Sequence, residues 1–163
     1  MKDSKTLINS ILLNQLYKEC LYKNKRQEEL REFCHHDLEH FLAVARIAYI
    51  INLERGMKLD KHIIYAAALL HDIGRWKQYQ EGTPHELASA ELSLEILKEC
   101  EYGASEIHII INAITSHREY HEGIENLSEL IYYADKKSRN CFDCQASQNC
   151  NWSEAKKNHG IEY

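Results

Sequence analysis

The chain has 163 residues, of which 44% are hydrophobic and 28% charged, and its net charge at neutral pH is −5. This length corresponds to one globular domain with a buried core. The negative net charge argues against an extended nucleic-acid-binding surface, and no stretch reaches the roughly 18 apolar residues that a membrane span needs. We therefore expect neither a nucleic-acid partner nor a membrane.

A single proline and six glycines indicate a chain built from helices. Average usage would give about 8 prolines, and sandwiches and barrels need more turn residues. We predict an all-α fold, a compact bundle of about six or seven helices. It forms a single domain over residues 1–163, with a core at about 37–139 and a short irregular tail at about 140–163 that contains cysteines and packs on the core.

Apolar spacing predicts the helices in chain order, at residues 5–19, 37–54, 60–72, 83–100, 105–117 and 126–139. The charged stretch at 23–32 is compatible with a short helix or with a loop. Thr83, Pro84 and Glu86 mark one helix start, because threonine caps, proline suits the first helical position and the glutamate completes a capping box. Beyond residue 139 the helical period is lost.

Four polar side chains lie on helix faces that their neighbours assign to the core. Each lies three, four, seven or eleven positions from apolar residues, which is the spacing of residues on one face of a helix. They are His40, His71, His117 and Asp135. Buried imidazoles and carboxylates need partners. A lone histidine of this kind is more often a satisfied core residue, but four such placements on four helices favour a shared divalent cation.

Three motifs resemble those of the HD-domain superfamily of metal-dependent phosphohydrolases. The first is His-Phe-Leu-Ala-Val at 40–44, the second is Ala-Leu-Leu-His-Asp-Ile-Gly at 68–74, and the third is Ala-Asp-Lys at 134–136. The resemblance covers about residues 37–139, and the central motif is the most specific. It implies a first metal ion held by His40, His71, Asp72 and Asp135.

Two further histidines resemble the ligands of the binuclear branch of this superfamily. His85 begins the helix after the His-Asp pair, and His117 ends the next helix. The resemblance implies that they bind a second ion and that Asp72 bridges both; helix-start chemistry near a charged loop is the alternative for His85. Imidazole and carboxylate ligands suit divalent iron, manganese, nickel, cobalt or zinc.

The remaining histidines are expected at the surface or in structural roles. They are His35, His36, His62, His108 and His159. His36 is the least secure of these, because it lies one helical turn before His40.

The ligand set predicts hydrolysis of a phosphate ester or anhydride by metal-activated water, because such ions polarise phosphoryl oxygens and lower the pKa of bound water to about 7. Asp72 would orient or deprotonate that water. Arg75 and Lys136 would bind phosphate charge, with a solvated surface charge as the alternative for each. Further substrate contacts are expected from Arg118, His121 and Arg139.

Differences between this sequence and the motifs of known branches narrow the range of expected substrates. Guanosine tetraphosphate hydrolases carry a Glu-Asp pair soon after the His-Asp pair, where this chain has Ile-Gly-Arg-Trp at 73–76. The cyclic-dinucleotide branch carries Gly-Tyr-Pro, which is absent here. The chain is most similar to small binuclear enzymes that cleave dinucleoside polyphosphates, although the cysteine tail is not part of that pattern. We expect a nucleotide or another small phosphorylated molecule as substrate.

Two other functional classes stay open at this point. One is the di-iron oxygenase branch of the same superfamily, which uses a similar set of six ligands. The other is a non-catalytic metal- or redox-sensing module. The polar N-terminus shows no signal-peptide pattern, which favours a cytoplasmic protein whose thiols stay reduced.

Three cysteines in the tail have the spacing of a structural metal site. Cys141, Cys144 and Cys150 lie within ten residues, and Cys-x-x-Cys is typical of structural zinc. The candidates for a fourth ligand are Cys34, Cys20, Cys100 or a histidine such as His35. Cys34 is favoured because it shortly precedes the His40 helix. We expect zinc in preference to an iron–sulfur cluster, with unliganded thiols as the alternative.

Overall fold

The computed structural model describes residues 3–120 and 122–163, and over these ranges it contains helices and no strands. The predicted all-α class is confirmed. The α-helices are α1 (Ser4–Leu13), α2 (Gln15–Gln27), α3 (Leu38–Glu54), α4 (Lys61–Leu70), α5 (Arg75–Glu81), α6 (His85–Glu99), α7 (Ala104–Ser116) and α8 (Leu127–Lys137). None of the described helices is long and apolar enough to cross a membrane.

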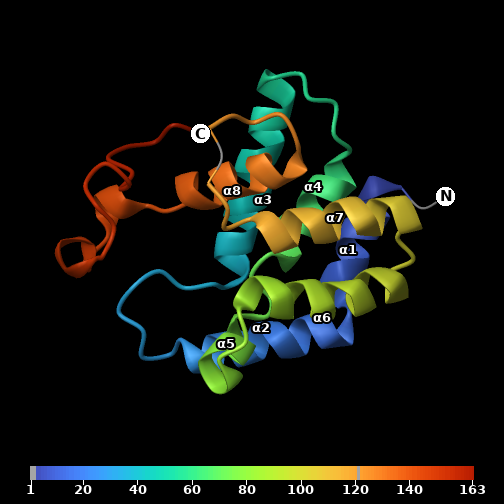
Figure 1. Cartoon of the computed structure of the whole chain (residues 1–163), viewed down its shortest axis with the longest axis horizontal. Helices are drawn as coiled ribbons and strands as arrows, with labels where there is room; N and C mark the ends of the chain where they lie inside the picture. The colour runs from blue at the N-terminus through green and yellow to red at the C-terminus, as the bar shows by residue number, and fades with distance from the viewer. Residues whose placement is uncertain (1–2, 121) are drawn as a thin grey trace.

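Helix α3 packs against α4 and α8, and α7 packs against α4, α6 and α8 (Figure 1). Helices α1 and α2 close the other side of the bundle, where α1 contacts α4 and α2 contacts α5. Large apolar side chains that are fully buried hold these helices together, among them Ile51, Ile64, Leu70, Ile114 and Leu130. Burying each contributes about 1.5–3 kcal/mol. The helix ends that carry the polar core residues therefore meet inside a well-packed bundle.

In the N-terminal region the structure corrects one prediction and decides an alternative that the sequence left open. The helix predicted at 5–19 is divided at Asn14, whose backbone is extended and whose Oδ1 accepts a hydrogen bond from the Tyr17 amide at 3.0 Å. This side chain caps α2, as an asparagine commonly does at a helix start. The charged stretch at 23–32 contains the end of α2 and the beginning of a loop that runs to Asp37. We call residues 28–37 the α2–α3 loop.

The segment after the His-Asp pair also differs from the prediction. Residues 75–81 form the additional helix α5, which ends at Gly82 with a left-handed φ of 74°. Helix α6 begins at His85, and no side chain caps it, so the predicted capping box of Thr83 and Glu86 is wrong. The reason is that Pro84 keeps an extended ψ of 126°, which moves the first helical residue beyond it.

The tail at 140–163 is irregular, as predicted, with two short 3₁₀ turns at Cys141–Asp143 and Ser147–Asn149. It is tied to α8 by the amide of Asn158, which donates to the carbonyls of Lys136 and Arg139 at 2.8 Å each. It also reaches the α2–α3 loop, on the same side of the bundle in Figure 1. There Asn149 donates to Glu32 at 3.2 Å.

Candidate metal centre

The turn that follows α4 is held against its neighbours by specific contacts. The amide N–H of Gly74 donates to Ser89 Oγ on α6 at 2.9 Å, and a Cβ at Gly74 would lie 2.4 Å from the Ser89 nitrogen. Asn24 on α2 donates to the carbonyl of Asp72 at 3.0 Å and accepts from the Trp76 amide at 2.9 Å. Glycine is required here because any side chain would collide with the backbone of α6.

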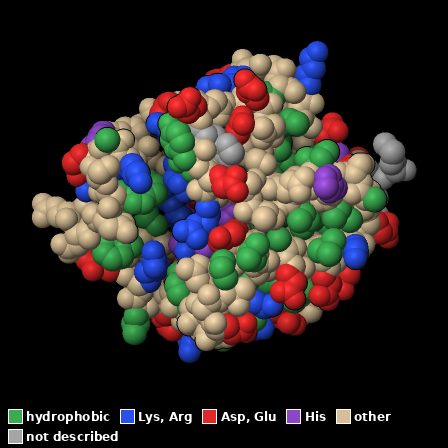
Figure 2. All heavy atoms as spheres, viewed as in Figure 1, with side chains coloured by type: hydrophobic (Ala, Val, Ile, Leu, Met, Phe, Trp, Pro, Cys, Tyr) green, Lys and Arg blue, Asp and Glu red, His purple; other side chains and the backbone are tan. Residues whose placement is uncertain are grey.

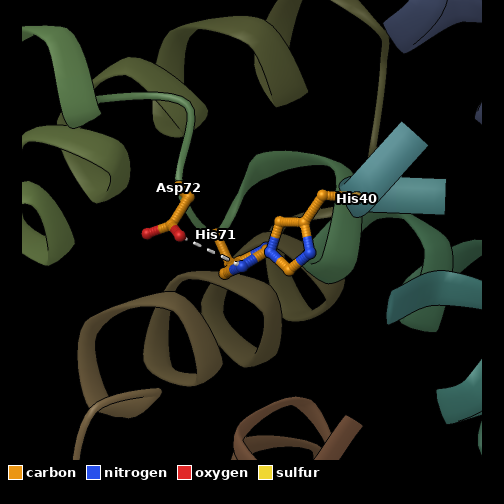
Figure 3. Close-up of side chains that lie close together, drawn as sticks. All are labelled: His40, His71 and Asp72. Carbon is orange, nitrogen blue, oxygen red and sulfur yellow. Dashed lines mark ion pairs between the residues drawn. The ribbon is translucent and has the colours of Figure 1, made fainter. Parts of the chain in front are cut away.

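The carboxylate of Asp72 stands between two groups of histidines. Its Oδ2 lies 3.4 Å from Nε2 of His71, and its Oδ1 lies 3.1 Å from Nε2 of His85 and 3.4 Å from Nε2 of His117. Two buried sets have donor atoms within 4.8 Å of one another, His40 with His71 and Asp72, and Asp72 with His85 and His117. Figure 3 shows His40 reaching from α3 toward His71, with Asp72 on the other side. Asp72 is common to both sets.

Asp135 on α8 completes the first set. Its Oδ1 lies 3.2 Å from Nε2 of His40 and 3.8 Å from Nε2 of His71, and its Oδ2 is 2.7 Å from Nζ of Lys136. The structure therefore brings together all six residues that the sequence nominated as ligands, from α3, the turn after α4, α6, the end of α7, and α8.

Each of the four ring systems is held through its other nitrogen. Nδ1 of His71 and of His117 bonds the carbonyl three residues earlier, at 2.7 and 2.6 Å. Nδ1 of His85 lies 2.6 Å from Gln78 Oε1, and Nδ1 of His40 lies 3.2 Å from Ser138 Oγ. An oxygen acceptor at Nδ1 places the proton there, so in the neutral ring Nε2 carries a lone pair. Metal-binding histidines are oriented in this way.

The donor set fits a divalent cation. Nε2 of His71 and Oδ1 of Asp72 are buried without a hydrogen-bond partner. The Nε2 atoms of His85 and His117 lie 3.3 Å apart, and two lone pairs at that distance repel unless a cation or a proton lies between them. Unpaired buried polar atoms are costly, and imidazole with carboxylate oxygen suits divalent transition metals. The ligand roles themselves stay a prediction.

The electrostatics keep the two carboxylates and His40 in their cation-binding forms. Burial disfavours the carboxylate of Asp72, but the charges of His71 and Arg75 outweigh it and hold its pKa well below the usual range. Burial lowers the pKa of His40 to about 4. Burial likewise opposes ionisation of Asp135, but its neighbours His40, His71 and Lys136 outweigh burial and hold its pKa well below normal. The carboxylates are therefore ionised and His40 is neutral at pH 7.

His36, expected at the surface or in a structural role, is a buried member of the centre. It is 4% exposed, and its Nε2 lies 3.6 Å from Asp72 Oδ2. Both oxygens of the buried Glu28 bond His36, one at Nδ1 (2.5 Å) and one at its backbone amide (2.7 Å). Tyr79 donates to the same carboxylate at 2.7 Å. The only signal in the sequence was its position four residues before His40; nothing indicated Glu28.

The other histidines set aside by the sequence lie away from the centre. His62 is buried and has a structural role, with Nδ1 at 3.1 Å from Ser4 Oγ and Nε2 at 2.7 Å from Glu106. The rest are exposed, namely His35, His108 and His159.

An open cleft of about 1090 Å³ leads to the centre, and His40 and Asp135 form part of its wall. Its cationic lining consists of Arg31, Arg75, Arg118, Lys136, Arg139 and Lys157. Figure 2 shows Lys and Arg side chains gathered around a hollow with histidine at its base. All the cations predicted to contact substrate therefore face one cleft, and His121 lies outside the described residues.

Two of these cations touch the centre itself. Arg75 Nε lies 3.5 Å from Asp72 Oδ1, and an Arg139 guanidinium nitrogen lies 3.0 Å from Nε2 of His40. Arg118 is more distant and exposed, and pairs with Glu86 at 3.4 Å. Because Arg139 approaches the ring nitrogen expected to bind an ion, a bound ion and this contact exclude each other.

The four cysteines of the predicted second site line the same cleft, and none forms a disulfide. They are Cys34, Cys141, Cys144 and Cys150. The two other cysteines, Cys20 and Cys100, are buried in the helical core.

Comparison with known proteins gives relatives of two kinds. A protein of Clostridium beijerinckii described as uncharacterized is 48% identical over 155 residues, covering 95% of this chain and 98% of that protein. Ribonuclease Y of Mycoplasma mycoides is 32% identical over 101 residues, and ribonuclease Y 1 of Pediococcus pentosaceus is 35% identical over 88 residues. These matches cover 62% and 54% of this chain, but the chain spans only 22% and 14% of the two ribonucleases. No solved structure matches significantly.

The family described as HD domain matches residues 37–140. The matched range begins at the cap of α3 and ends after α8, so it contains all six clustered residues. The chain belongs to the HD domain family.

Proposed function

We propose that the protein is a metal-dependent phosphohydrolase that cleaves a phosphate ester or anhydride of a nucleotide or another small phosphorylated molecule. The observation that carries the proposal is the position of Asp72, whose two oxygens face separate sets of histidine nitrogens behind a cationic cleft with His40 and Asp135 in its wall. Membership of the HD domain family supports it, because proteins of this family are generally metal-binding hydrolases.

His40, His71, Asp72 and Asp135 would hold one ion, and Asp72, His85 and His117 a second. When bound, such ions polarise a phosphoryl oxygen and make water a stronger nucleophile at neutral pH. The carboxylate of Asp72, kept ionised by its surroundings, would orient the attacking water and accept its proton. Arg75 is fixed beside Asp72 and would stabilise the charge that develops on the phosphoryl oxygens.

The cleft favours a small polyanionic substrate. Six Lys and Arg side chains line it, and arginine suits phosphate because of its planar, bidentate donors. Lys136 and Arg139 lie at the inner end, beside Asp135 and His40, whereas Arg118 is exposed near the entrance. The net charge of −5 over the whole chain does not favour a long nucleic acid. Because some relatives are named ribonuclease Y, short RNA must be tested as an alternative substrate.

A panel of substrates tests the proposal. Nucleotides, dinucleoside polyphosphates, simple phosphate esters and a short RNA oligonucleotide would be incubated with the protein and iron, manganese, nickel, cobalt or zinc under anaerobic conditions. We expect release of phosphate or a nucleotide from a small substrate, and loss of that activity in Asp72→Asn. The control is Asp60→Asn, because Asp60 is exposed and its side chain makes no capping hydrogen bond.

The same panel decides between the alternatives. Turnover that requires oxygen, with no phosphate released anaerobically, would replace the hydrolase with the oxygenase. Cleavage of the RNA alone would move the substrate class to nucleic acid. Metal binding without turnover of any substrate would favour the sensing module.

A further inference from the structure

The cysteines of the tail and of the α2–α3 loop line the same cleft. Cys144 and Cys150 each directly follow a 3₁₀ turn, and Cys141 begins the first of these turns. Cys34 comes from more than 100 residues earlier in the chain and lines the same cleft. All four thiols are free and partly buried. Four soft donors from two segments are the composition of a structural metal site.

The structure selects the fourth ligand that the sequence left open. Cys20 and Cys100 are 0% and 3% exposed within the helical core. His35 is exposed, and its Nε2 lies 2.9 Å from the carbonyl of Arg31. Cys34 differs from all of them, since it is partly buried and lines the same cleft as the three tail cysteines.

Positive charge and a backbone donor surround these sulfur atoms. The Arg139 guanidinium favours the thiolate of Cys34 and donates to the neighbouring carbonyl of His35 at 2.8 Å. The amide of Trp152 donates to Sγ of Cys150 at 3.5 Å. Lys157 lines the same wall and donates to the carbonyl of Ser147 at 2.7 Å. Such contacts stabilise the negative charge that thiolates bring to a metal ion.

We propose that Cys34, Cys141, Cys144 and Cys150 bind one structural zinc ion, at a site separate from the histidine-rich centre. Zinc takes four thiolates in a tetrahedron and has no redox chemistry of its own. Among the described residues, the donor sets already within 4.8 Å of one another belong to the histidine centre. Zinc would therefore draw the sulfur atoms together and fasten the tail to the α2–α3 loop, which carries His36.

Cobalt substitution distinguishes this site from the histidine centre, which contains no sulfur. Adding Co²⁺ to metal-free protein under reducing conditions should produce an intense thiolate-to-cobalt charge-transfer band. The band should reach its maximum at about one equivalent bound to sulfur and disappear on adding zinc. It should persist in His71→Ala, which impairs the histidine centre, and weaken or vanish in Cys144→Ser and in Cys34→Ser.

Cys100→Ser is the control, because it removes a thiol that lies outside the cleft. Zinc content of the purified proteins should fall by about one equivalent in the two cleft variants only. Alkylation of the parent protein gives an independent measurement that needs no substitution: the four thiols should be protected until a chelator removes the zinc. A cobalt complex without the thiolate band, equal zinc content in all variants, or iron with inorganic sulfide in the purified protein would overturn the proposal. These outcomes do not depend on whether the protein is a hydrolase.

Discussion

At the scale of single residues, the notable feature is how each histidine of the centre is oriented. His71 and His117 use a carbonyl of their own helical turn, whereas His40 and His85 rely on side chains of α8 and α5. A backbone carbonyl in the same turn stays in place when side chains are changed, whereas a side-chain acceptor can be removed by substitution. Ser138 is the clearest case, because its hydroxyl donates to the Asp135 carbonyl at 2.7 Å and so faces His40 as an acceptor.

Ser138→Ala should weaken metal binding without unfolding the protein. His40 would lose the acceptor at Nδ1 that fixes its ring and its tautomer, a change that typically costs about 10- to 100-fold in metal affinity or activity. Metal titration and steady-state kinetics would measure this. Ser10→Ala is the matched control, since Ser10 donates to the carbonyl three residues earlier in the same way but meets no histidine. Equal effects of the two substitutions would contradict the role given to Ser138.

The pair of Glu28 and His36 makes stability depend on acid. Burial would raise the pKa of Glu28, but its hydrogen bonds and the charge of His36 lower it from 4.5 to about 2. A carboxyl with a depressed pKa stabilises the fold above its ordinary pKa, and that contribution is lost as the pH falls toward 2. Glu28→Gln should therefore be less stable at neutral pH, on the order of 2 kcal/mol.

The difference between Glu28→Gln and the parent should narrow as the pH falls below about 4.5, where the parent carboxyl begins to lose its advantage. Urea unfolding at a series of pH values would show this. A difference that stays constant with pH would mean that the charge of Glu28 contributes nothing to stability.

Residue patterns found the clustered side chains that lie on helices or at their ends, and missed those that lie in the loops between helices. His40, His71, His117 and Asp135 have apolar neighbours at helical spacing, so their faces could be assigned from the sequence. His36 and Glu28 are in or beside a loop, where no period assigns a face. Their burial follows from how the α2–α3 loop folds over the turn after α4, which is a tertiary contact that local sequence does not encode.

At the scale of elements, the turn after α4 is the part on which the centre depends. Gly74 packs closely against α6 and donates a hydrogen bond to it, and Asn24 of α2 donates a hydrogen bond to the turn. The sequence predicted that the helix would end at residue 72, but it did not predict that α5 would follow. A segment of seven residues between two glycines is too short to show a helical period, and it becomes a helix because Trp76 packs into the core.

Gly74→Ala should strongly destabilise the protein. The added Cβ would lie 2.4 Å from the backbone nitrogen of Ser89 and 2.6 Å from the carbonyl carbon of Ala88, and backbone atoms inside a packed helix cannot move aside cheaply. We expect a loss of about 2 kcal/mol or more, measured by urea unfolding, together with weaker metal binding. Gly123→Ala is the control, since a Cβ there meets nothing within 4 Å. A Gly74→Ala protein as stable as the parent would refute the close approach.

At the scale of the whole molecule, the cleft combines surfaces from distant parts of the chain. The α2–α3 loop, the start of α5, the end of α8 and the tail all contribute to its wall. The family resemblance implied a phosphate site, but the extent of its cationic lining could not be predicted. Arg31 and Lys157 lie in loop and tail segments, and only the folded chain places them in the same cleft as Arg75 and Arg139.

Substrate binding should weaken with salt because the cleft attracts anions through several charges. Arg118→Gln should raise KM roughly threefold, the effect of one exposed ion pair, and should reduce the dependence of KM on salt, while kcat changes little. Arg46→Gln is the control, since Arg46 is exposed on α3 and does not line the cleft. An unchanged KM in Arg118→Gln would remove this residue from the substrate contacts.

The hydrogen bonds of Asn24 have a consequence for where the functional unit begins. The family match starts at residue 37, yet the amide that holds the Asp72 backbone and the carboxylate that holds His36 belong to residues 24 and 28. A fragment cut at the edges of the match would retain every proposed histidine-centre ligand, but it would lose Asn24, which holds the backbone of Asp72, and the buried pair of Glu28 and His36. The first two helices therefore lie outside the family match, although α1 packs on α4 and α2 supports the turn that carries the centre.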